Sequence, residues 1–78
     1  MRILTFGNCC ENAVKNHENA VIAAKNCGVD EPENISDLLE MIKYGVYTTP
    51  AIVIDGEVVS AGKRLSVSRI ESLIKERL

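Results

Sequence analysis

The chain has 78 residues, of which 46% are hydrophobic and 26% are charged. This composition differs from that of disordered segments and suits one folded domain over residues 1–78. A formal charge of −2 and a pI near 5.3 argue against nucleic-acid binding, which needs a concentrated basic face. Apolar runs such as Ala51–Ile54 are far shorter than the roughly 20 residues of a membrane span.

The N-terminus and the cysteines indicate the compartment. No apolar segment typical of a signal peptide follows Met1 and Arg2, so we expect a cytoplasmic protein. The three cysteines are an odd number and cannot form a complete disulfide framework. In a reducing compartment such thiols are typically reactive, metal-binding or buried.

The N-terminal part predicts a strand and then a long helix. Arg2–Phe6 is short and apolar, as in a strand buried on both faces, and it stops at Gly7. Apolar residues then recur every three or four positions, with asparagine and lysine on much of the remaining surface, up to a helix stop at Gly28. The expected inward-facing stripe consists of Ala13, Val14, His17, Ala20, Val21, Ala24 and Cys27.

The middle of the chain predicts a short strand and a short helix. Val29–Ile35 contains Pro32, which an edge strand tolerates better than a central one. Ser36 is expected to cap the next helix, with Asp37 in its first turn and Gly45 beyond its end.

The C-terminal part predicts a hairpin and a last helix. Two β-branched runs, Ala51–Ile54 and Glu57–Ser60, are joined by Asp55-Gly56, and Asp-Gly is among the strongest short hairpin signals. Ser66 opens a helix that runs to Leu78. The predicted order is β-α-β-α-β-β-α.

Two adjacent thiols, Cys9 and Cys10, lie where the first strand gives way to the first helix. Free backbone N–H groups and the helix dipole favour an anion at this position. A thiolate is such an anion and is the reactive form of cysteine. This makes Cys10 the candidate nucleophile.

Several motifs together resemble a known family. They are Phe6-Gly7 before a cysteine, the block Tyr44–Gly56 and Gly62 before the last helix. With the element order, they make the chain similar to small archaeal and bacterial thioredoxin-like proteins of the redox-active disulfide protein 2 type. The resemblance implies an α/β minimal thioredoxin fold, in which a four-stranded mixed sheet is flanked by three helices.

The resemblance also implies roles for individual residues. It predicts a cis peptide bond between Thr49 and Pro50, with the Thr49 backbone pairing with an extended substrate. An ungapped match to the family's Cys-x-x-Cys motif puts Cys10 at the first cysteine and Ala13 at the second. The resolving thiol is therefore missing, and Cys9 is an additional thiol before the nucleophile.

Other partners for Cys10 are poorly placed within the chain. Adjacent residues such as Cys9 have Cα atoms about 3.8 Å apart, whereas disulfides usually need about 4.4–6.8 Å. Cys27 lies 17 residues further along the predicted helix, on the order of 25 Å away. His17 is two turns away, about 10 Å, and is expected to be a packed core residue.

The sequence therefore leaves two functional hypotheses. In the first, the protein is a thioredoxin- or glutaredoxin-like oxidoreductase with catalytic Cys10, less favourably Cys9, and Thr49 and Pro50 as the substrate-binding wall. Its partners would be a protein disulfide or a low-molecular-weight thiol, with a thioredoxin-reductase-like electron donor and no metal or other cofactor. In the second, a non-enzymatic thioredoxin-like module binds a partner or a soft metal through the Cys9-Cys10 pair.

Overall fold

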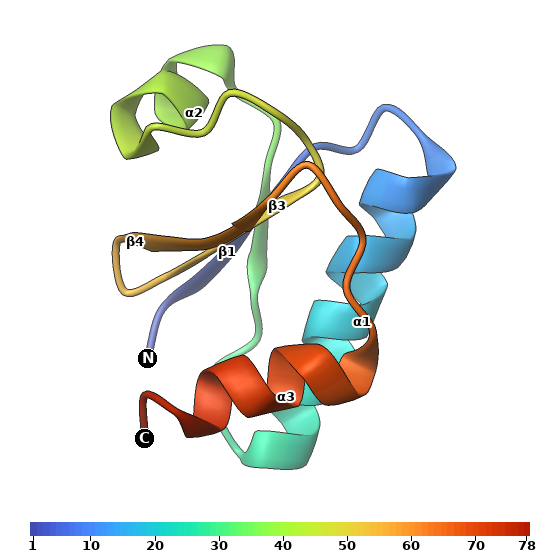
Figure 1. Ribbon diagram of the computed structural model, residues 1–78, viewed down its shortest axis with the longest axis vertical. Helices are drawn as coiled ribbons and strands as arrows, with labels where there is room; N and C mark the ends of the chain where they lie inside the picture. The colour runs from blue at the N-terminus through green and yellow to red at the C-terminus, as the bar shows by residue number, and fades with distance from the viewer.

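The sheet has the strand order β2-β1-β3-β4, and helices cover both of its faces (Figure 1). The computed structural model describes residues 1–78. In chain order the elements are β1 (Ile3–Phe6), α1 (Glu11–Cys27), β2 (Glu33–Ile35), α2 (Leu38–Tyr44), β3 (Ala51–Ile54), β4 (Glu57–Ala61) and α3 (Val67–Lys75). Strands β1 and β2 are parallel, whereas the pairs β1–β3 and β3–β4 are antiparallel. The predicted α/β architecture of a minimal thioredoxin fold is confirmed.

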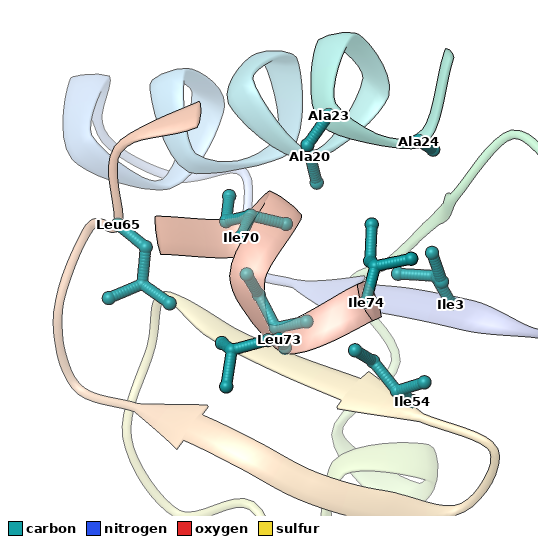
Figure 2. Packing of buried hydrophobic residues seen from close by; sticks show 10 residues of the cluster. Ile3, Ala20, Ala23, Ala24, Ile54, Leu65, Ile70, Leu73 and Ile74 are labelled. Atoms are coloured by element: carbon teal, nitrogen blue, oxygen red, sulfur yellow. The ribbon is translucent and has the colours of Figure 1, made fainter. Parts of the chain in front are cut away.

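The two central strands, β1 and β3, are buried along their whole length. Because side chains alternate along a strand, each strand supplies both faces of the sheet with apolar residues. Helices α1 and α3 cover one face, where Ala20 and Ala23 pack close to Ile70 (Figure 2). The opposite face carries a smaller cluster consisting of Leu4, Phe6, Val46, Ala51 and Val53, packed against Met41 and Tyr44 of α2.

The inward face of α1 differs from the predicted stripe. Asn16 is fully buried, whereas Val14 is 45% exposed. The Leu65 N–H donates to Asn16 Oδ1 at 3.0 Å, and Asn19 Nδ2 donates to the Leu65 carbonyl at 2.9 Å. These two bonds attach the segment before α3 to α1 and give Asn16 a partner that burial requires.

The starts of the two shorter helices depend on side-chain caps. Ser66 Oγ accepts from the Arg69 N–H at 3.2 Å, as predicted for α3. For α2 the cap is Asp37 and not Ser36, because Asp37 Oδ1 accepts from the Leu39 N–H at 2.8 Å. The regular part of α3 ends at Lys75, three residues before the predicted end.

None of the helices combines the length and the apolar character needed to cross a membrane.

Candidate functional site

Cys10 is the N-cap residue of α1, in extended conformation with φ −144° and ψ 167°. Its carbonyl accepts from the Val14 N–H at 3.1 Å, but its side chain makes no capping hydrogen bond. The N–H groups of Glu11, Asn12 and Ala13 have no backbone acceptor. An exposed thiol therefore lies at the end of a 17-residue helix where free donors and the helix dipole favour an anion.

The other two cysteines occupy different environments. All three are free thiols, and Cys9 is exposed like its neighbour Cys10. Cys27 is the last residue of α1 and packs against the core cluster between α1, α3 and the sheet. It therefore lies at the opposite end of the helix, about 25 Å from Cys10.

Gly7 fixes the start of the loop that carries Cys9 and Cys10. Its N–H donates to the Ile35 carbonyl at 3.1 Å, and its carbonyl accepts from Asn34 Nδ2 at 3.0 Å. Strand β2 thus holds the backbone just before the two thiols.

The Thr49–Pro50 loop packs against this same point. A Cβ atom on Gly7 would lie 2.9 Å from Thr49 Cβ, too close for any side chain. The Thr49–Pro50 peptide bond is cis, Pro50 is buried and Thr49 is half-buried. Gly7, at the start of the loop that carries the two thiols, therefore packs against Thr49, at the end of the sheet where β1 ends (Figure 1).

A polar network lies behind the loop, around Thr5 in the middle of β1. Thr5 is buried, and its Oγ1 lies 2.7 Å from His17 Nδ1 and 3.1 Å from Asn34 Nδ2. Asn34 thereby connects Thr5 to Gly7. His17 was predicted to be a packed core residue; it is half-buried, and it is hydrogen-bonded to Thr5 of β1.

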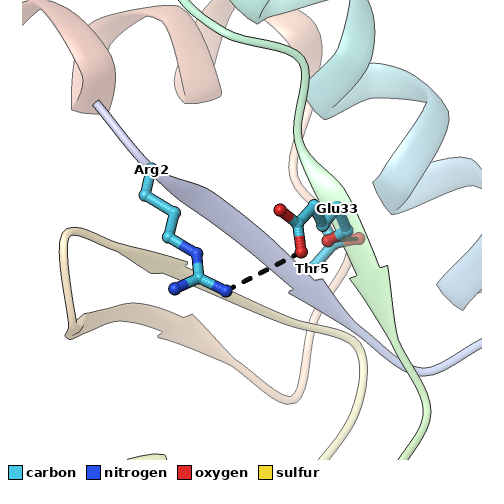
Figure 3. A network of polar contacts seen from close by, with 3 residues as sticks. All are labelled: Arg2, Thr5 and Glu33. Atoms are coloured by element: carbon cyan, nitrogen blue, oxygen red, sulfur yellow. Dashed lines mark hydrogen bonds and ion pairs between the residues drawn. The ribbon is translucent and has the colours of Figure 1, made fainter.

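Sequence reasoning missed this network, although one residue signalled it. Thr5 is the only polar side chain in the strand Ile3–Phe6, and a buried hydroxyl requires a hydrogen-bond partner. Beside it, on the exposed side of the β1–β2 pair, Arg2 Nη2 lies 3.8 Å from Glu33 Oε2 (Figure 3). This ion pair contributes little to the stability of the fold because both side chains are more than half exposed.

Metal ligands are scarce around the thiols. The structure contains no group of three or more His, Cys, Asp or Glu residues placed to hold a metal ion. Structural zinc sites almost always have four ligands. A structural zinc ion bound by Cys9 and Cys10 would therefore need ligands from a second molecule.

The sequence comparisons agree with the fold. A family model described as thioredoxin domain matches residues 1–75. A thioredoxin of Methanothermobacter thermautotrophicus is 29% identical over 75 residues, covering 95% of this chain and 97% of that protein. A thioredoxin of Methanocaldococcus jannaschii is 31% identical over 77 residues, covering 97% of this chain and 88% of that protein. Such relatives indicate thiol–disulfide redox function in general, and the chain belongs to the thioredoxin domain family.

Proposed function

We propose that the protein catalyses thiol–disulfide exchange with Cys10 as its only nucleophile and an external thiol as the resolving group. The observation that carries this proposal is the exposed, uncapped Cys10 side chain at the start of α1. Membership of the thioredoxin domain family supports the class of chemistry. The single-cysteine mechanism is proposed because position 13 of this chain is alanine.

The reaction proceeds in two exchange steps. The Cys10 thiolate attacks one sulfur of a substrate disulfide, the substrate S–S bond breaks, and the departing thiolate takes a proton from solvent. Cys10 is now in a mixed disulfide. An external thiolate then attacks the substrate sulfur of this mixed disulfide, which regenerates the Cys10 thiolate and leaves the external thiol joined to the bound half of the substrate.

The residue at position 13 is the reason for an external resolving thiol. Ala13 is 1% exposed and lies in the first turn of α1, three residues after Cys10, at the spacing of the second cysteine in the Cys-x-x-Cys motif. Its methyl group cannot attack a mixed disulfide. Cys9 is a poor substitute because a disulfide between adjacent residues is strained.

Thr49 supplies the opposite wall of the proposed site. Neither its N–H nor its C=O has a backbone hydrogen-bond partner in the protein, so both are free to pair with an extended substrate segment, as in strand addition. Pro50 beside it is buried and supports the wall. A partner of this kind would be a protein disulfide or a small disulfide with a peptide-like backbone.

Matched serine variants test the proposal. The reduced protein is incubated with 2-hydroxyethyl disulfide and followed by intact-mass spectrometry and peptide mapping. We expect the native chain and Cys9→Ser to form one adduct at residue 10, which reduced glutathione removes, and Cys10→Ser to form none.

Two results would contradict the exchange function. One is a Cys10 that forms no mixed disulfide and is alkylated at pH 7 no faster than an ordinary exposed thiol. The other is a stoichiometric metal that is retained on purification and lost in both serine variants, which would instead support the binding module with its Cys9-Cys10 pair.

A further inference from the structure

The segment between β4 and α3 is held at both ends beside the proposed site. The Gly62 N–H donates to the Pro50 carbonyl at 2.8 Å. Three residues later, the backbone of Leu65 is hydrogen-bonded to Asn16 and Asn19 of α1. The segment therefore passes from the Thr49–Pro50 loop to the side of α1 (Figure 1).

Lys63 and Arg64 occupy the two positions between these anchors. Both are exposed, and neither takes part in an ion pair. They are the only two basic residues adjacent in the sequence of this acidic chain. An uncompensated charge of this kind creates a local positive potential in a protein whose net charge is −2.

The anchors also limit how far these cations lie from Cys10. The three steps from Gly62 to Leu65 span at most about 10 Å of extended chain. Asn16 follows Cys10 by six residues, which is about 9 Å along the helix axis. The backbone that carries the two cationic side chains therefore runs between Pro50 and the first turns of α1.

We infer that Lys63 and Arg64, hereafter the cationic strap, select disulfides whose flanking groups carry carboxylates. This inference rests on the proposed exchange function of Cys10. A carboxylate next to the attacked sulfur meets the strap while the substrate backbone lies along Thr49. The strap acts through charge and touches no reacting atom, so it determines specificity and not the exchange step itself.

Two charge variants with equal net change test the inference. In Lys63→Gln/Arg64→Gln the strap is neutral. In Lys25→Gln/Lys75→Gln two exposed, unpaired lysines are neutralised in the last turns of α1 and α3, at the end of the molecule away from the loop after β1 (Figure 1). Mixed-disulfide formation at Cys10 is timed with oxidised glutathione, cystamine and 2-hydroxyethyl disulfide, which are anionic, cationic and uncharged.

We expect the strap variant to react about threefold to tenfold more slowly with oxidised glutathione at low ionic strength. Its rate with 2-hydroxyethyl disulfide should be unchanged, and its rate with cystamine unchanged or higher. Salt should shrink the difference because these charges are exposed to solvent. Two disulfide-linked peptides, one with Glu and one with Gln beside the cysteine, then distinguish a protein substrate from glutathione. If the strap variant slows the reaction with the Glu peptide more than the reaction with oxidised glutathione, the substrate is a protein segment.

Four outcomes would overturn the inference. If the strap variant keeps the relative rates of the native chain with the three probes, Lys63 and Arg64 do not determine the substrate preference. An equal loss in the Lys25→Gln/Lys75→Gln variant attributes the preference to net charge. Failure of Cys10 to react even with the uncharged probe removes the exchange function and this inference with it, whereas normal reaction with that probe and no charge preference removes the inference alone.

Discussion

Gly7 and Thr49 approach so closely that no side chain fits on Gly7. A Cβ atom there would lie 2.9 Å from Thr49 Cβ and 3.2 Å from its Cγ2, and the Gly7 backbone has φ +98°. The contact joins the end of β1 to the loop before β3. The relative position of the thiols and the Thr49–Pro50 wall therefore depends on a residue without a side chain.

Gly7→Ala is expected to destabilise the protein by about 2–4 kcal/mol, because the alanine is strained at positive φ and overlaps Thr49. Urea unfolding measures the loss. Gly28→Ala is the matched control, since Gly28 has φ +71° but no atom within 4 Å of its Cβ position, so only the conformational cost of about 1–2 kcal/mol applies. Equal losses in the two variants would show that the contact with Thr49 is unimportant.

Asn16→Asp tests how the fold uses a buried amide. Asn16 Oδ1 accepts from the Leu65 N–H, but the buried Nδ2 has no partner. An aspartate keeps the acceptor and removes the unpaired donor, at the cost of a buried carboxylate if it ionises. The free energy of unfolding at pH 7 should fall by at least about 2 kcal/mol.

The loss in this variant should depend on pH. Burial raises the pKa of the new carboxyl in the folded protein above the value of about 3.9 in the unfolded chain. The unfolded state then binds fewer protons, so the variant loses stability relative to the native chain as pH rises above about 4 and regains it as pH falls. Asn12→Asp, exposed in the first turn of α1, should show no such trend, and a similar trend there would contradict the explanation.

The elements that sequence predicted well are those with local signals. The strands Ala51–Ile54 and Ile3–Phe6 and the Asp55-Gly56 turn follow from apolar runs and from turn chemistry within a few residues. The burial of Asn16 could not be predicted in this way, because its partner Leu65 lies 49 residues away in sequence. A polar residue is recognised as internal only when its hydrogen-bond partner is known.

The site shows the same division. Cys10, Thr49 and Pro50 were predicted as site residues from motif resemblance and the strand-to-helix junction, and they remain predictions. The bond from Asn34 to the Gly7 carbonyl was not predicted, since it depends on how the exposed edge strand β2 is aligned beside β1. The position of Lys63 and Arg64 likewise depends on the packing of Gly62 against the Pro50 loop.

The sequence predicted Ser36 as the cap of α2, whereas the structure has Asp37, and two variants test which residue stabilises the helix. Asp37→Ala should cost about 1 kcal/mol, because it removes the acceptor for the Leu39 N–H at the start of α2. Ser36→Ala should change the free energy of unfolding by less than about 0.5 kcal/mol. Chemical denaturation of the two variants in parallel decides, and a larger loss in Ser36→Ala would restore the cap predicted from sequence.

Ala13→Cys is expected to convert the single-thiol site into a dithiol site. Residues three apart in an α-helix have Cα atoms about 5 Å apart, which is within the Cα separation of about 4.4–6.8 Å that disulfides usually have. After oxidation, intact-mass spectrometry and peptide mapping should find an internal Cys10 disulfide. The adduct with 2-hydroxyethyl disulfide should no longer accumulate, because the new thiol displaces it faster than an external thiol does.

Asn12→Cys is the control for this gain of function. Residues two apart on a helix do not face each other, and Asn12 is exposed whereas Ala13 is buried. This variant should therefore keep the persistent Cys10 adduct of the native chain. An adduct that persists equally in Ala13→Cys would mean that position 13 does not face Cys10, and the match of this chain to the Cys-x-x-Cys motif would then be wrong at its second position.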